Sequence, residues 1–139
     1  MITKKRPRGL RNNNPLNIRI GNDWRGEVKH ATDREFEQFT SMTWGCRAGF
    51  IILKRYIQQY GCNTVEKIIR RWAPETENDT KAYINKVCRL SGLKRDEQLT
   101  FENSQAMLSL FKAMAQVENG CSISPMDILM GYQAATDNH

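Results

Sequence analysis

The chain has 139 residues, of which 40% are hydrophobic and 26% charged. This length and composition are typical of one globular domain with a single hydrophobic core. No apolar run approaches the ~18 residues of a membrane-spanning helix. No apolar segment follows the basic start as it would in a signal peptide. We therefore expect no membrane span and no signal peptide, so that a separate route would have to carry the protein to any target outside the cytoplasm.

The net charge of +6 is concentrated near the N-terminus. Residues 1–30 contain eight Lys or Arg and two acids, whereas the rest of the chain is balanced. We expect a basic flexible arm at 1–9, which is either a solvated tail or a contact for an anionic polymer or a partner protein, followed by one domain at 10–139. The helical patterns after residue 44 show no basic recognition face, which disfavours nucleic acid as the partner.

Residues 10–40 lack a helical period and are rich in turn-forming residues such as the Asn-Asn-Asn-Pro run at 12–15. Two strand-like runs, 17–20 and 35–39, separate these turns. The pattern predicts a small irregular β-hairpin or three-stranded sheet.

From residue 41 onward, apolar residues recur at three- and four-residue steps, which indicates amphipathic helices. Ser41, Thr64 and Asp79 (or Asn78) can cap helix starts, and glycines at 61, 92 and 120 can end them. The expected helices cover about 41–60, 64–73, 79–91, 103–118 and 125–135. The predicted fold class is mainly α (α+β), a small N-terminal β element followed by about five helices, and we expect a monomer.

The four cysteines and two histidines show no metal-ligand spacing, since no Cys-x-x-Cys motif is present. We therefore expect no metal or cofactor. Reduced thiols are favoured over disulfides, although the even number of cysteines leaves disulfides open.

Three groups of residues could carry chemistry. The first is the Asn-rich segment 12–19 with Trp24, which could offer amides and a flat ring to a sugar, or could be a turn-rich edge whose tryptophan fills the core. The second is segment 71–83, which gathers acids beside Trp72 and Tyr83, or is only a capped helix start.

The third is Glu118, at the end of an apolar helix stripe. Glycoside cleavage needs a carboxylic acid held protonated in a partly apolar site, although the position taken alone favours an exposed surface glutamate near a helix end.

The Arg-Gly-x-Arg-Asn-Asn-Asn-Pro-x-Asn-Ile-Arg string at 8–19, with Arg-Trp-Ala-Pro-x-x-Glu-Asn-Asp-Thr-x-x-Tyr at 71–83, resembles a group of phage and prophage virion-associated proteins. The resemblance covers about residues 8–120. It implies a phage origin and contacts with other virion proteins through the basic arm. The expected location is the phage virion, or the host cytoplasm with export by a separate route.

A second resemblance carries more chemistry. Segment 13–19, followed by Trp24-x-Gly26 and Phe36-x-x-Phe39, is similar to motifs of cell-wall glucosaminidases of the flagellar and autolysin type. Those enzymes have a lysozyme-like fold, in which the helix that carries the general acid precedes the Asn-Asn motif. Here the similar helix, 113–120, comes last, which implies a circular permutation; termini that lie close in space tolerate such a rearrangement.

The resemblance implies a role for each candidate residue. Glu118 would be the general acid, Glu37 the second carboxylate (with Asp33 and Glu35 as substitutes), and Tyr83 would stabilise developing charge. The residues expected to bind the glycan are Asn13, Asn14, Asn17, Arg19, Trp24, Trp72, Glu77 and Asn78.

The resulting hypothesis is cleavage of peptidoglycan glycan strands, by a glycoside hydrolase or a lytic transglycosylase, during phage lysis or entry. If only one acid is needed, a transglycosylase is favoured, because closure by the sugar's own hydroxyl needs no base to activate water. The alternative is a non-catalytic virion structural or peptidoglycan-binding protein, because a fold alone does not imply an activity.

Overall fold

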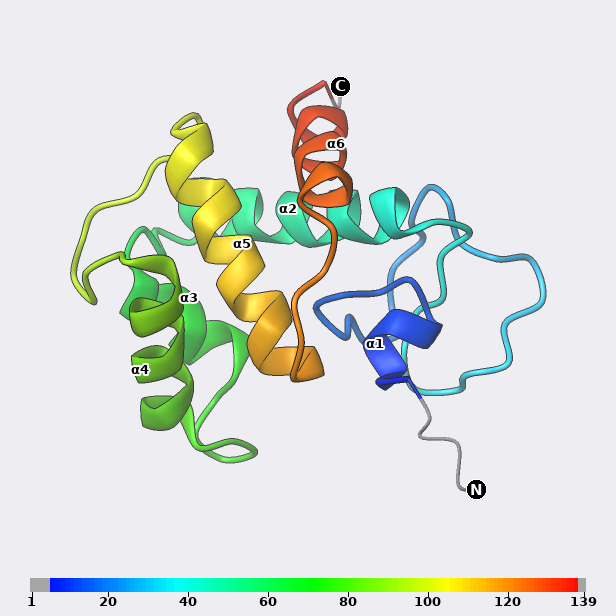
Figure 1. Ribbon diagram of the computed structural model, residues 1–139, viewed down its shortest axis with the longest axis horizontal. Helices are drawn as coiled ribbons and strands as arrows, with labels where there is room; N and C mark the ends of the chain where they lie inside the picture. The colour runs from blue at the N-terminus through cyan, green and yellow to red at the C-terminus, as the bar shows by residue number, and fades with distance from the viewer. Residues whose placement is uncertain (1–5, 138–139) are drawn as a thin grey trace.

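The computed structural model describes residues 6–137, and its helices form one packed body (Figure 1). Along these residues lie α1 (Arg8–Arg11), α2 (Met42–Gln59), α3 (Val65–Trp72), α4 (Thr80–Ser91), α5 (Ser104–Asn119) and α6 (Pro125–Thr136). The mainly α prediction is confirmed. No helix within the described range is both long and apolar enough to cross a membrane.

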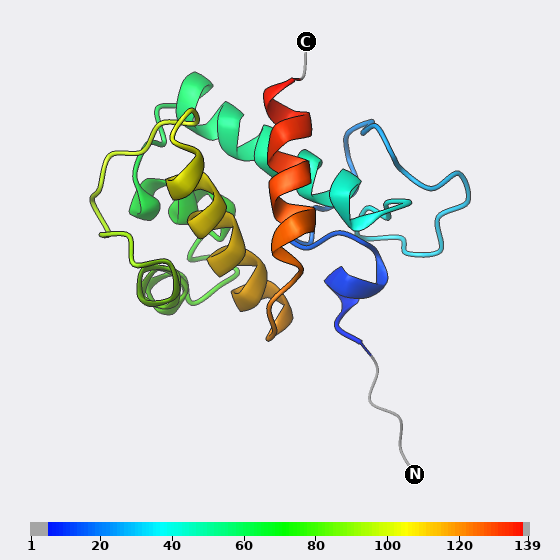
Figure 2. The same cartoon turned by 45° about the horizontal axis from the view of Figure 1, so that its top comes forward.

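Helix α2 runs across the molecule and organises the rest of it. Helices α3 and α4 lie at one end of α2, the N-terminal segment lies at the other, and α5 and α6 pack across it (Figures 1 and 2). The core is aromatic where these helices meet, since the ring of Phe50 stacks on Phe111 at 4.2 Å and meets Tyr132 edge-on. Gly131 lets α6 approach α2 closely, because a Cβ there would collide with Cys46.

The helix starts follow the expected capping chemistry. The side chains of Ser41, Thr64 and Asp79 accept hydrogen bonds from the backbone N–H groups three residues later, which satisfies donors that the helix itself leaves free. Gly92 and Gly120 end α4 and α5 in the left-handed conformation, with φ of 77° and 72°.

The predicted N-terminal β-hairpin or sheet is wrong. Within residues 6–137 the segment forms only isolated antiparallel bridges, Arg19 with Phe36 and Glu27 with Phe39. Side chains replace a strand ladder: Asp33 accepts from the backbone N–H groups of Glu35 and Phe36. The expected lysozyme-like α+β class with a β element is therefore contradicted.

Positive backbone angles give the local reason. Asn13 and Asn17 have φ of 52° and 54°, and these values break an extended run. Asparagine tolerates this region better than most residues because its short side chain bonds the local backbone. Of the two apolar residues at 17–20, Ile18 packs into the core and Ile20 is 49% exposed, and the segment pairs with 35–37 through a single bridge only.

Of the basic arm expected at 1–9, residues 1–5 lie outside the described part of the chain. Arg8 and Gly9 belong to α1, and the Arg8 guanidinium forms an ion pair with Asp33 at 2.7 Å. The four cysteines are unpaired; Cys46 is buried and Cys121 exposed.

Candidate functional site

A cavity of about 660 Å³ opens between the N-terminal segment, the second half of α2, the end of α3 and the end of α5. We call it the Glu118 groove. Its lining combines aromatic rings, amides, arginines and two carboxylates: Leu16, Asn17, Ile18, Arg19, Asn22, Phe36, Ile52, Arg55, Tyr56, Tyr60, Arg71, Trp72, Ala73, Glu77, Asn78 and Glu118.

Three uncharged donors from three parts of the chain hold the carboxylate of Glu118. The Asn17 amide donates to Oε1 at 3.0 Å, and the Trp72 indole and Tyr83 hydroxyl donate to Oε2 at 3.3 and 2.8 Å. The side chain is half-buried in the groove. The donors fix the orientation of the carboxyl group while leaving it in contact with the cavity.

The end of α5 is fixed against the N-terminal turn. Asn119, which is 7% exposed, donates from its amide to the carbonyl of Pro15 at 2.8 Å. Both views show α1 and the turn after it beside this end of α5 (Figures 1 and 2). Glu118 therefore faces the Asn-rich turn although 101 residues separate it from Asn17.

Tyr83 lies on α4 below Glu118 and is almost fully enclosed. Burial, the nearby charge of Glu118 and the hydrogen bond to it raise the pKa of the Tyr83 phenol well above its ordinary value. The phenol therefore keeps its proton and remains a donor. The expectation that Tyr83 accompanies Glu118 agrees with this geometry.

The other predicted binding residues divide into two sets. Asn17, Arg19, Trp72, Glu77 and Asn78 line the groove together with Glu118. Asn13, Asn14, Trp24 and Glu37 are not among the lining residues.

Asn14 is fully buried and stabilises the turn. Its amide donates to the carbonyls of Ile18 and Glu37, and its oxygen accepts from the Ile18 N–H. Asn13 donates to the Phe39 carbonyl at 3.1 Å. Both amides therefore attach segment 36–39 to the turn by hydrogen bonds, without lining the groove themselves. Trp24 is 7% exposed and packs in the core.

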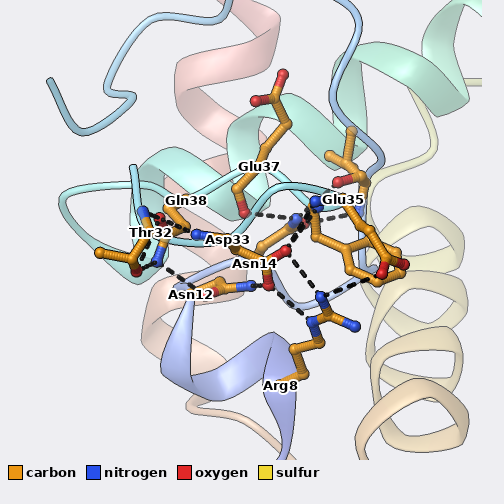
Figure 3. A network of polar contacts seen from close by, with 10 residues as sticks. Arg8, Asn12, Asn14, Thr32, Asp33, Glu35, Glu37 and Gln38 are labelled. Atoms are coloured by element: carbon orange, nitrogen blue, oxygen red, sulfur yellow. Dashed lines mark hydrogen bonds and ion pairs between the residues drawn. The ribbon is translucent and has the colours of Figure 1, made fainter. Parts of the chain in front are cut away.

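Glu37 lies apart from the groove and is only 5% exposed. In Figure 3 its carboxylate points away from the polar network that links Arg8 to residues 32–38. Burial and the neighbouring Glu27 raise the pKa of Glu37 to about 7. Asp33, a substitute candidate, is held by Arg8 and Asn12, and the Arg8 guanidinium lowers its pKa.

The sequence interpretation missed the contribution of α2. Arg55, Tyr56 and Tyr60 line the groove from its second half. The Arg71 guanidinium lies 3.8 Å from the ring centre of Tyr60 and 5.2 Å from that of Tyr56. The signal in the sequence that could have identified these residues is the cluster of polar and aromatic side chains at the end of an otherwise apolar helix.

No family model matches the chain. A comparison with curated proteins gives 48% identity over 117 residues to Protein P5 of Pseudoalteromonas phage PM2. The match covers 81% of this chain and 71% of that relative.

Proposed function

Since the chain belongs to the family of Protein P5 of phage PM2, we propose that it is a phage protein that cleaves the glycan strands of peptidoglycan, in the virion or at lysis. The observation that carries the proposal is the Glu118 carboxylate, oriented by three uncharged donors at the wall of a cavity of about 660 Å³. Cavities of roughly 300–1,000 Å³ are typical of small-ligand sites.

The lining suits a sugar chain. Amides such as Asn17 and Asn78 can bond hydroxyl and acetamide groups, and rings such as Trp72 can pack against sugar faces. Glu118 would donate its proton to the glycosidic oxygen while the bond from that oxygen to the anomeric carbon breaks. The donors from Asn17, Trp72 and Tyr83 would hold the resulting carboxylate in place.

The position of Glu37 favours transglycosylase chemistry over hydrolysis. A hydrolase of the common two-carboxylate type needs a second carboxylate across the bond that is cleaved. Glu37 lies outside the lining, and Glu77, the other acid in it, is exposed and has no side-chain hydrogen bond or ion pair among the described residues to orient its carboxylate. In the transglycosylase route, the Glu118 carboxylate takes the proton of a hydroxyl on the same sugar, and the freed oxygen closes onto the anomeric carbon to give an anhydro sugar.

A second candidate is a non-catalytic virion component that binds peptidoglycan. The same three hydrogen bonds favour it, because they join the N-terminal turn, α3 and α4 to the end of α5. A carboxylate in that position could serve the fold alone.

The test compares release of soluble glycan from purified peptidoglycan by the wild type, Glu118→Gln and Asp96→Asn. Asp96 is exposed and lies outside the groove, so it controls for loss of a surface carboxylate. We expect Glu118→Gln to lose at least a hundredfold in rate, because glutamine cannot transfer the proton. Some loss of stability accompanies it, because both carboxylate oxygens of Glu118 accept hydrogen bonds and glutamine has a single acceptor oxygen. Anhydro ends in the products support the transglycosylase route.

Equal release by the wild type and Glu118→Gln would remove Glu118 from catalysis. If the wild type releases nothing but sediments with the peptidoglycan, the non-catalytic candidate replaces the proposal.

A further inference from the structure

Three arginines line the Glu118 groove: Arg19, Arg55 and Arg71. Each guanidinium lies over an aromatic ring, of Phe36 at 5.1 Å, Trp24 at 5.5 Å and Tyr60 at 3.8 Å from the ring centre. A guanidinium that stacks on a ring through its face keeps its N–H edges free to donate.

None of the three arginines forms an ion pair with a carboxylate of residues 6–137. Three arginines elsewhere are paired, since Arg70 and Arg95 share Glu66 and Arg8 pairs with Asp33, whereas Arg34 and Arg89 form no ion pair among the described residues. Glu118 itself is held by uncharged donors rather than by an arginine. The groove therefore holds one oriented carboxylate and three cations without a carboxylate partner among residues 6–137, and Arg71 also hydrogen-bonds the Tyr56 hydroxyl.

We propose that Arg19, Arg55 and Arg71 bind carboxylate groups carried by the glycan and make the groove selective for anionic over neutral sugar chains. This inference rests on the function proposed above. In peptidoglycan, alternate sugars carry a lactyl ether that either ends in a carboxylate or leads into a peptide with carboxylates of its own. Arginine binds a carboxylate in a two-point geometry that an uncharged amide does not satisfy equally well.

The acids of the groove argue against a polyphosphate or nucleic-acid ligand. Glu77 and Glu118 lie in the same lining as the arginines. A phosphate backbone carries a charge at every residue and would have to pass both carboxylates. A glycan with carboxylates on alternate sugars can place neutral rings beside Glu118 and charged groups at the arginines.

The experiment measures binding by calorimetry to four ligands: soluble peptidoglycan fragments, the same fragments with their carboxylates converted to amides, a neutral N-acetylglucosamine oligomer, and a single-stranded oligonucleotide. The proteins are the wild type, Glu118→Gln, single Arg→Gln variants at 19, 55 and 71, and the triple variant. Glu118→Gln is included because it should bind the ligand without consuming it. Arg89→Gln is the matched control, because Arg89 is exposed on the last turn of α4 and lies outside the groove.

We expect the wild type to bind the native fragments at least tenfold more tightly than the amidated fragments or the neutral oligomer. Each single substitution should weaken binding to the native fragments by about two- to fivefold, as is typical of partly exposed ion pairs. The triple variant should bind native and amidated fragments alike, while Arg89→Gln matches the wild type.

Equal affinity of the wild type for native and amidated fragments would overturn the inference, as would tighter binding of the oligonucleotide. The two proposals can fail separately. Cleavage without selectivity for charge removes the role of the arginines alone, whereas selective binding without cleavage removes the enzymatic proposal and leaves the arginines as an anionic-glycan site.

Discussion

Replacing Glu37 by glutamine should stabilise the protein above neutral pH. Glu37 is 5% exposed, its Oε2 has no hydrogen-bond partner, and its closest acidic neighbour is Glu27. A charge in that position lacks both water and a cation. Burial and the Glu27 carboxylate raise the pKa of Glu37 from an ordinary 4.5 to about 7.

The sign and size follow from proton linkage. Below pH 4.5 both folded and unfolded chains hold the proton, so Glu37 contributes nothing that depends on pH. Between pH 4.5 and about 7 the unfolded chain releases the proton while the folded one keeps it, so the free energy of unfolding falls as pH rises. At 1.36 kcal/mol for each pH unit between the two pKa values, the loss above pH 7 reaches at most ~3 kcal/mol.

Urea unfolding of the wild type and Glu37→Gln at pH 4.5 and pH 8 measures this effect. The variant should exceed the wild type by about 1–3 kcal/mol at pH 8 and match it near pH 4.5. Asp96→Asn, which removes an exposed acid, should leave the pH dependence unchanged. A stability difference between wild type and Glu37→Gln that is the same at both pH values would refute the reasoning.

Three further predictions concern the scaffold, each measured as a change in the free energy of unfolding. Asn14→Ala should cost roughly 2–4 kcal/mol because it removes three buried hydrogen bonds and leaves their partners unsatisfied; a cost near zero would contradict the structural role. Phe111→Ala should cost about 3–5 kcal/mol through the cavity left against Phe50, whereas Lys112→Ala, at an exposed position beside it, should cost little. Asp79→Ala should cost about 1 kcal/mol by leaving the N–H of Ala82 uncapped, and Asp79→Asn should retain most of that stability.

The helices could be predicted because their signals are local. Apolar spacing sets which face of α2 or α5 is buried, and a capping side chain such as Ser41 marks the start within one residue. The β element failed because alternating apolar residues at 17–20 do not reveal whether a neighbouring strand is present. Asn14 and Asp33 bond the backbone there, and the resulting turns leave room for single bridges only.

The site was partly predictable for a different reason. Motif residues near the two ends of the chain, Asn17 and Glu118, could be paired only by resemblance, since nothing local links positions 101 residues apart. Glu37, predicted as the second carboxylate, does not line the groove. Alternation along 35–39 predicts which face a side chain takes only if a sheet exists. Of the groove arginines, Arg19 was predicted, whereas Arg55 went unrecognised because an exposed arginine on a helix looks the same in sequence whether it borders solvent or a cavity.

The position of Glu118 links the proposed chemistry to the completion of the fold. Its three donors come from the N-terminal turn, α3 and α4, and the acid itself from α5, so the carboxyl group is oriented only when all four parts have assembled. Tyr83→Phe separates orientation from packing, because phenylalanine fills the same buried space and removes only the donor at 2.8 Å. If Glu118 is a catalytic acid, this variant should lose about tenfold or more in the rate of glycan release and alter its pH profile, while the affinity for glycan is kept. If Glu118 serves the fold alone, Tyr83→Phe should instead lower the free energy of unfolding and leave the affinity for glycan and the pH profile of glycan release unchanged. That pattern would count against catalysis even where the native structure is intact.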